Sequence, residues 1–237
     1  MRVSVVITAW NAADTLAETL DSVAAQTRLP NEVIVVDDGS TDQTAEVAKN
    51  HKLPLQVVSK SNGGMTSAIN AGVDAATGDV IAFLDSDDLW LPNKTELQLA
   101  FLDENPSVDI VTGHYEAFEC PSIPPERFAT MDYAKGRQPG YLTGCVMIRK
   151  RWLFGAQYRF DEKLKFNGLM DWFIRARDGG AVEKVMPDLV MRRRIRPGTL
   201  GSRAAASASK QSFDKDVLEI ARRALAMKRE AKTEKRN

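Results

Sequence analysis

The sequence predicts an α/β fold with an open, mostly parallel sheet and helices on both of its faces. Three observations support this prediction. Apolar runs rich in Val and Ile alternate with segments whose apolar residues recur at helical spacing. The runs are continuous rather than alternating, which is typical of strands covered on both faces. Several runs end abruptly in polar or acidic residues, and ligands of such sheets bind beyond the carboxyl ends of the strands.

In the first half of the chain, each of the first three predicted strands is followed by a predicted helix. The strands cover 3–8, 32–38, 55–59 and 79–85. The helices lie within 11–27, 39–50 and 63–78. Leu16, Leu20 and Val23 show the helical spacing in the first of them. This repeated unit accounts for the parallel part of the predicted sheet.

The second half of the chain is less regular. It predicts a helix at 93–105, a strand at 107–113, a long loop at 119–140, a strand at 141–150, a helix at 168–180 and an extended segment at 183–196. From Ser202 the composition changes to small and then basic residues around one further helix. We therefore predict one domain over 1–201 and a C-terminal helical, basic tail over 202–237.

Charge and cysteine usage limit the classes of partner and compartment. Thirty-two Lys and Arg balance thirty-two Asp and Glu, so the net charge does not favour nucleic acid as a partner. Cys120 and Cys145 are too few for a disulfide framework, so we expect free thiols. No signal peptide or membrane-spanning run is evident, and we expect a cytoplasmic protein. The basic tail packs on the domain or, alternatively, contacts the inner face of the membrane.

Three carboxylates, those of Asp85, Asp87 and Asp88, follow the predicted strand 79–85 in the stretch "FLDSDD". Crowded acids repel one another unless a cation or a hydrogen-bonding ligand offsets them. In an extended segment, Asp85 and Asp87 point to the same side and can face one ligand. Such oxygen donors suit Mg²⁺ or Mn²⁺, and an ion on Asp87 would stabilise a leaving diphosphate. The alternative is that these acids only cap the helix that follows.

Two further loops contribute candidate ligand groups at the same edge of the sheet. Asp37 and Asp38 end the second predicted strand, where a carboxylate could accept hydrogen bonds from a nucleobase imide or a ribose hydroxyl. Asn62, Gly63 and Gly64 precede a predicted helix, and glycines allow the backbone to approach a phosphate closely. Taken alone, each loop is also compatible with an ordinary turn.

Four stretches of the chain, taken in their order along the sequence, match the motifs of a known family. They are "VSVVITAWNAADTLAETLDSVAAQT", "EVIVVDDGSTDQTAEVA", "SNGGMTSAINAGVDAATGDVIAFLDSDD" and "LMDWFIRAR". Together they resemble the successive motifs of a family 2 glycosyltransferase with the GT-A fold, from about residue 2 to about residue 200. The resemblance implies transfer of a sugar from a nucleotide-diphosphate donor to an acceptor hydroxyl, with inversion at the anomeric carbon.

The resemblance also implies roles for particular residues. Asp171 matches the position of the catalytic base, which would take the proton of the acceptor hydroxyl. Asp87 matches the metal ligand, and the implied ion is Mn²⁺ or Mg²⁺. The residues implied to contact the nucleotide sugar are Thr8, Ala9, Asn11, Asp37, Asp38, Asn62, Gly63, Gly64, Asp85, Ser86 and Arg196.

Two positions depart from the family pattern. Met170 stands where many members carry an acid before the base, and Arg196 stands near the place where many carry a His close to the diphosphate. Arg194 or Arg196 could hold the diphosphate in a bidentate manner without binding metal, or the run of arginines could be a solvated strand face. For Asp171, the alternative role is a dipole partner at the start of a helix.

The predicted function is therefore an inverting, metal-assisted glycosyltransferase. On the resemblance alone, we expect a UDP-sugar donor, a carbohydrate or glycolipid acceptor and a setting in polysaccharide or glycoconjugate synthesis. Two alternatives stay open. The first is a nucleotidyltransferase that makes the activated sugar, although "TAWNAADTLAETL" lacks the Gly-rich loop expected for a triphosphate. The second is a sugar-nucleotide-binding protein without catalysis, which Met170 and the missing His make conceivable.

Overall fold

The computed structural model describes residues 1–120, 136–164, 167–195 and 215–222. Its strands are β1 (Val3–Ala9), β2 (Glu32–Asp37), β3 (Gln56–Ser59), β4 (Val80–Asp85), β5 (Leu89–Trp90), β6 (Ile110–Glu119), β7 (Gln138–Pro139), β8 (Val146–Arg149) and β9 (Glu183–Ile195). Its longer helices are α1 (Leu16–Ala24), α2 (Thr44–Lys49), α3 (Met65–Ala75), α4 (Lys94–Glu104) and α6 (Gly168–Asp178). Short 3₁₀ turns are η2 (Thr143–Cys145), η3 (Lys150–Trp152) and η4 (Ala156–Tyr158).

The first half of the chain forms the parallel part of the sheet, as the sequence predicts. β1 pairs in parallel with β2 on one side and with β4 on the other, and β3 pairs in parallel with β2. Val5, Val6 and Ile7 of β1 are all fully buried, which explains the continuous apolar run. Because these strands are parallel, their carboxyl ends lie along one edge of the sheet.

The second half of the chain extends the sheet with strands of mixed direction. The order is β3-β2-β1-β4-β8-β6-β9-β5, and β7 pairs with β6. β8 is antiparallel to both β4 and β6, whereas β9 is parallel to β6. β5 is antiparallel to β9 and only two residues long, so its sequence carries no strand signal.

The predicted strand at 141–150 is longer than the observed one, since only Val146–Arg149 join the sheet. Thr143–Cys145 form η2 instead. A Cβ at Gly144 would lie 2.3 Å from Met191 Sδ, so the side chain of Met191 fills the space beside this glycine. The predicted loop 119–140 contains β7, and its residues 121–135 lie outside the described residues.

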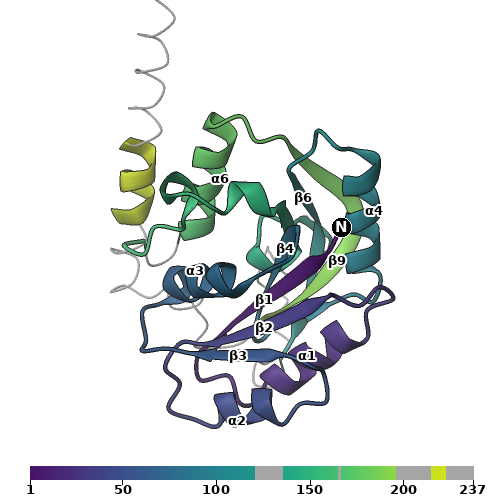
Figure 1. Ribbon diagram of the computed structural model, residues 1–237, viewed down its shortest axis with the longest axis vertical. Helices are drawn as coiled ribbons and strands as arrows, with labels where there is room; N and C mark the ends of the chain where they lie inside the picture. Colours follow the sequence, from purple (N-terminus) through teal and green to yellow (C-terminus); the bar gives the residue numbers. More distant parts are fainter. Residues whose placement is uncertain (121–135, 165–166, 196–214, 223–237) are drawn as a thin grey trace, which may run out of the picture.

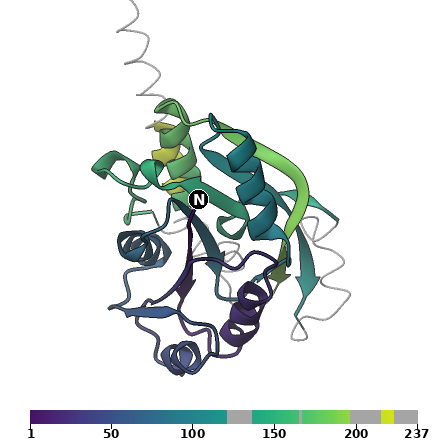
Figure 2. The ribbon, with the colours of Figure 1, turned by 45° about the vertical axis from the view of Figure 1, so that its right-hand side comes forward.

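Helices cover both faces of the sheet, as Figures 1 and 2 show. On one face, Leu20 of α1 and Leu102 of α4 pack in a core with Ile7 of β1. On the other face, Ile69 of α3 and Trp172 of α6 belong to a second core with the strand residues that point that way. The two cores fix the helices against the sheet, and the loops at its carboxyl edge are therefore held at both ends.

The described part of the predicted tail is a helical segment at 215–222, which lies near α6 (Figure 1). Asp216 and Ile220 in this segment are buried. The predicted boundary at residue 201 lies outside the described residues and stays a prediction. Over the described ranges, no helix has the length and apolarity needed to cross a membrane. Cys120 and Cys145 are free thiols, as predicted.

Candidate functional site

The polar ends of three neighbouring strands meet at one edge of the sheet. Thr8 of β1 lies opposite Asp85 of β4, and Ala9 lies opposite Asp37 of β2. The backbone N–H of Asp38 donates to the carbonyl of Ala9 over 2.9 Å. The parallel register therefore brings together the strand-end residues that the sequence singled out, although they are distant in the chain.

The loop after β1 is fastened to the loop after β2. Asn11, whose φ is 48°, accepts a hydrogen bond on its side-chain oxygen from the N–H of Thr41 over 2.8 Å. The N–H of Asn11 in turn donates to Ser40 Oγ over 2.9 Å. Asn tolerates a left-handed backbone better than most residues, and its side chain also closes the loop here. Asn11 thus shapes the region in which we predict nucleotide contact.

Asp37 and Asp38 are both buried, with 6% and 4% of their surface exposed. Asp37 Oδ1 accepts the N–H of Ser40 over 3.0 Å. Asp38 accepts the N–H of Gly63 over 2.9 Å and the N–H of Gly64 over 2.8 Å. The carboxylate of Asp38 therefore anchors the glycine loop, a structural role that the sequence did not predict. A contact of either acid with a nucleoside stays a prediction.

Lys60 completes the anchor of the glycine loop. Its ammonium donates to Asp38 Oδ1 and to the carbonyl of Ser61 over 2.8 and 2.7 Å. Gly39 has φ of 74°, and a Cβ there would lie 2.7 Å from the backbone N of Asn62. The loop after β2 and the loop before α3 thus touch through backbone, which requires glycine at this position.

The acidic stretch after β4 forms a turn, and the expected extended segment is wrong. β4 ends at Asp85, and the N–H of Asp88 donates to the carbonyl of Asp85 over 3.1 Å. Asp85 and Asp87 nevertheless lie close enough to repel each other. Ser86, predicted to contact the nucleotide sugar, is 8% exposed, and its carbonyl accepts from Thr15 Oγ1 over 2.9 Å.

Burial and mutual repulsion perturb the titration of these acids. Burial raises the pKa of Asp85 to about 7, repulsion from Asp87 adds to the effect, and the charge of Arg193 opposes it. Burial also raises the pKa of Asp88 well above its ordinary value, followed by repulsion from Asp87 and Asp85. The N–H of Arg194, which donates to Asp88 Oδ1 over 2.9 Å, offsets part of this shift. Burial and the neighbouring carboxylates thus make Asp85 and Asp88 harder to ionise than ordinary aspartates.

A divalent cation fits this donor set. The described residues contain no group of three or more His, Cys, Asp or Glu arranged to hold a metal ion by themselves. Mg²⁺ typically takes one or two carboxylates and fills its other positions with water and substrate phosphate. The residues that would hold the ion are Asp87, which the family resemblance implies, and Asp85, whose carboxylate is close enough to interact with that of Asp87.

Asp171 lies in the first turn of α6 and is 2% exposed. Arg175 Nε donates to Asp171 Oδ2 over 2.8 Å. Gly168 begins α6, and a Cβ there would lie 2.3 Å from Cγ2 of Thr66, two residues beyond Gly64. The start of the helix that bears Asp171 therefore packs against the first turn of α3, the helix that follows the glycine loop. Asp171 thus has an ion-pair partner at i,i+4 spacing as well as the place in the first turn that suits a helix-dipole partner, and its role as the base stays a prediction.

The arginines of β9 are only partly as predicted. The Arg194 side chain is 9% exposed, so the solvated strand face is wrong for this residue. Its Nε donates to the carbonyl of Asp87 over 2.9 Å, and its Nη2 donates to the carboxylate of Glu18. These contacts tie Arg194 to the turn after β4 and to α1, and a contact of Arg194 with a diphosphate stays a prediction. Arg196 lies outside the described residues, so its contact stays a prediction.

Trp10 is a residue of this edge that the sequence analysis missed. It lies between Ala9 and Asn11 at the end of β1, and 43% of its surface is exposed. Its partial exposure at this edge makes Trp10 a candidate for contact with a nucleobase. The signal in the sequence was an aromatic residue directly after a strand end.

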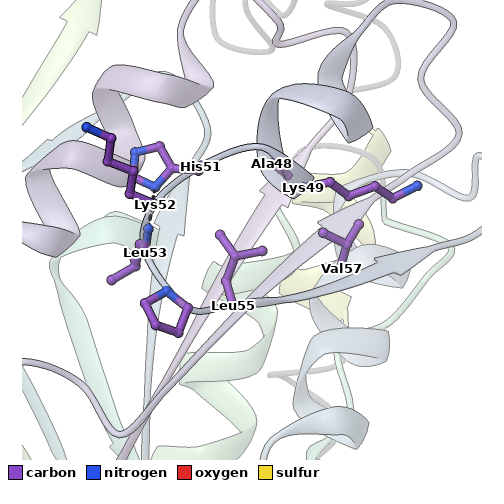
Figure 3. Close-up of a pocket in the computed structure, with 8 residues that line it drawn as sticks. Ala48, Lys49, His51, Lys52, Leu53, Leu55 and Val57 are labelled. Carbon is purple, nitrogen blue, oxygen red and sulfur yellow. Dashed lines mark hydrogen bonds between the residues drawn. The ribbon is translucent and has the colours of Figure 1, made fainter.

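An open pocket of roughly 360 Å³ lies elsewhere on the molecule (Figure 3). Its lining residues are Ala48, Lys49, His51, Lys52, Leu53, Pro54, Leu55 and Val57. They belong to the end of α2, the loop that follows it and β3, at the amino edge of the sheet. The pocket is therefore separate from the carboxyl edge where the candidate site lies.

The fold and the strand-end acids define a class of protein, the nucleotide-diphospho-sugar transferases with the GT-A fold. The chain belongs to the family described as Glycosyl transferase family 2, whose sequence pattern matches residues 4–154. The mixed α/β sheet is that of GT-A glycosyltransferases, as the sequence predicted. The resemblance drawn from the four motifs is thereby confirmed.

Relatives and solved structures agree with this placement. The chain is 32% identical over 182 residues to an uncharacterized glycosyltransferase, RT0329, of Rickettsia typhi, covering 72% of this chain and 57% of that protein. It is 30% identical over 177 residues to the uncharacterized glycosyltransferase YibD of Escherichia coli, covering 70% of this chain and 51% of that protein. The chain thus spans little more than half the length of these relatives.

Two crystal structures of S. aureus TarS 1-349 are similar to this chain. The one in complex with UDP-GlcNAc has a TM-score of 0.70 and 25% identity, covering 92% of this chain and 66% of that chain. The one in complex with UDP has a TM-score of 0.66 and 26% identity, covering 83% of this chain and 61% of that chain.

Proposed function

We propose that this chain is an inverting glycosyltransferase that moves a sugar from a nucleotide-diphosphate donor to an acceptor hydroxyl. The observation that carries the proposal is the meeting of Thr8, Asp37 and Asp85 at one sheet edge. The helix of Asp171 packs nearby, against the first turn of α3, which follows the glycine loop. A UDP-sugar is the proposed donor, and the binding of UDP and UDP-GlcNAc by TarS supports it.

The donor end of the site follows from the strand-end groups. The nucleoside would lie over the loops of Asn11, Asp37 and Asn62, where Trp10 is a candidate for contact with the nucleobase. Arg196 would add a positive charge near the diphosphate. A Mn²⁺ or Mg²⁺ ion on Asp87, when bound, would neutralise the charge that develops on the diphosphate as it leaves.

Asp171 would act as the general base. Its carboxylate would take the proton of the acceptor hydroxyl while the hydroxyl oxygen bonds to the anomeric carbon and the bond from that carbon to the diphosphate oxygen breaks. Attack from the face opposite the leaving group gives inversion. Arg175 would orient the carboxylate, because its guanidinium is tied to the carbonyl of Arg159 over 2.8 Å as well as to Asp171.

The acceptor and the cellular setting follow from the family. We propose a carbohydrate or glycolipid acceptor, a role in polysaccharide or glycoconjugate synthesis and a site of action in the cytoplasm. A peripheral membrane contact would use the basic tail at 202–237, which ends in "KREAKTEKRN". A vesicle-flotation assay with anionic lipid checks this contact, and recovery of the full chain in the lipid-free fraction contradicts it.

Release of UDP from UDP-sugars, measured with and without candidate acceptors, tests the proposed chemistry. Asp171→Asn should lower transfer by about 10²–10⁴-fold and leave donor binding unchanged. Asp178→Asn, at an exposed position of the same helix, is the matched control. Full activity of Asp171→Asn contradicts the base. Donor binding without turnover by the wild type would favour the inactive binder, and release of pyrophosphate from a nucleoside triphosphate would favour the nucleotidyltransferase.

A further inference from the structure

We propose that Arg194 is a positioning residue that fixes the metal-binding carboxylates of Asp85 and Asp87 through the backbone of the turn that bears them. The inference rests on the proposed function, because it assumes that these acids bind a metal and diphosphate. It assigns to Arg194 a role in the site that involves no contact with the substrate.

Three consecutive carbonyls of the turn accept hydrogen bonds from side chains of distant elements. The carbonyl of Ser86 accepts from Thr15 Oγ1 over 2.9 Å, and that of Asp88 accepts from Thr19 Oγ1 over 3.0 Å. The carbonyl between them, of Asp87, accepts from Arg194 Nε over 2.9 Å. The backbone of the turn is therefore held in place at each of these three residues.

Arg194 contributes more contacts to this turn than either threonine. Its backbone N–H donates to Asp88 Oδ1 over 2.9 Å, and its side chain donates to the carbonyl of Asp87, so Arg194 is bonded to two successive residues of the turn. Its guanidinium also pairs with Glu18. Glu18 lies on α1 between Thr15 and Thr19, at the spacing that places all three on one face. Arg194 thus connects β9, on which it lies, to α1 and to the turn after β4.

The contacts of Arg194 matter for the site because the turn carries like charges. Asp85 and Asp87 repel each other, and a free turn would relieve the repulsion by moving its carboxylates apart. A metal ion needs both oxygens in place before it binds. Groups that orient metal ligands typically contribute about 10–100-fold to metal affinity. Loss of Arg194 should therefore weaken the metal-dependent part of donor binding selectively.

Arg192 provides a matched control on the same strand. The guanidinium groups of Arg192 and Arg194 each lie 4.7 Å from the centre of the Phe118 ring. Arg192 pairs with Glu116 over 3.6 Å instead of with the turn. Replacing Arg192 by Met therefore removes a charge and the same ring contact while leaving the carbonyl of Asp87 bonded.

The experiment is calorimetric titration of the full chain with UDP, once with saturating Mn²⁺ and once with a chelator. In Arg194→Met we expect the Mn²⁺-dependent gain in UDP affinity to fall by about 10–100-fold, with unchanged affinity in chelator. Arg192→Met should match the wild type. Arg194→Lys should fall between the two, because Lys keeps the charge and one donor but loses the fork. Glu18→Gln should give a smaller selective loss and serves if Arg194→Met does not fold.

Two results would overturn the inference. If Arg194→Met shows the same Mn²⁺-dependent gain in UDP affinity as the wild type, the contacts of Arg194 with the turn are not needed for metal binding. An equal loss of UDP affinity with and without Mn²⁺ would show that Arg194 supports only the general fold. If the wild type itself gains no UDP affinity from Mn²⁺ or Mg²⁺, the proposed metal-assisted function fails, and that outcome is distinguishable because no variant is needed to see it.

Discussion

In α6, Arg175 Nε donates a 2.8 Å hydrogen bond to Asp171 Oδ2, and both side chains lie largely within the protein. Removing one partner of a buried ion pair leaves the other charge uncompensated. Arg175→Met should therefore lower the free energy of unfolding by about 3–5 kcal/mol, as measured by urea denaturation. Arg177→Met, which breaks an exposed pair with Glu183, should lower it by less than about 1 kcal/mol. Equal effects of the two would contradict a structural role for the buried pair.

The sequence predicted the candidate site residues better than the residues that hold them in place. Thr8, Asp37 and Asp85 could be placed together because parallel strands end at one edge, so local patterns and the strand order were enough. The contacts of Lys60 with Asp38 and of Arg194 with Asp87 could not be predicted this way, since these pairs are brought together only by tertiary packing. Arg175 did have a signal, its i,i+4 spacing from Asp171 in "LMDWFIRAR".

The same limit explains the errors in the fold. The N-terminal strands follow one repeated unit and were predicted in full, but β8 and β5 depend on neighbours far along the chain. Thr143–Cys145 of the predicted strand form η2, where Gly144 lies against Met191 of the distant strand β9. The turn after Asp85 likewise depends on hydrogen bonds from α1 and β9 rather than on its own residues.

Gly64 should be required for donor binding as well as for backbone geometry. Its φ is 87°, and its N–H donates to Asp38. Gly64→Ala introduces backbone strain of about 1–3 kcal/mol, because φ of 87° with ψ of 170° is a conformation almost confined to glycine. The variant should also weaken UDP binding by distorting the glycine loop. Gly180→Ala is the control, because Gly180 has φ of 95° and also has open space around it. Calorimetry should show weaker UDP binding only for Gly64→Ala, and identical UDP affinities would contradict this role of the loop.

Lys94 should make stability depend on pH. It is fully buried, its ammonium donates to Gln98 Oε1 over 2.6 Å, and burial lowers its pKa to about 7. Between pH 7 and the ordinary pKa of Lys, the unfolded chain holds a proton that the folded chain lacks. The contribution of Lys94 to the free energy of unfolding therefore rises with pH, by about 1.4 kcal/mol per unit.

Urea denaturation of the wild type and of Lys94→Met at pH 7 to about 9 checks this sign. We expect the difference between the two proteins to change steadily in favour of the wild type as the pH rises. Comparing the two proteins removes the contributions of titratable groups that do not interact with Lys94. A difference that stays constant across this range would contradict the assignment.

Asp85 should make metal binding depend on pH. Burial raises its pKa to about 7, followed by repulsion from Asp87, so below this value a metal ion must displace a proton. The Mn²⁺-dependent gain in UDP affinity should therefore increase from about pH 5.5 to about pH 7.5. Asp85→Asn should bind more weakly and lose this increase. A gain that is flat over the same range in the wild type would place the metal away from Asp85.

The measurement that tests the account most directly compares UDP binding by the wild type and by Asp87→Asn, with Mn²⁺ and with chelator, in a calorimetric titration of the full chain. We predict that Mn²⁺ strengthens binding to the wild type, that the strengthening is lost in Asp87→Asn, and that both proteins bind UDP equally in chelator. Equal strengthening by Mn²⁺ in both proteins, or none in the wild type, would contradict a metal-assisted donor site at the end of β4.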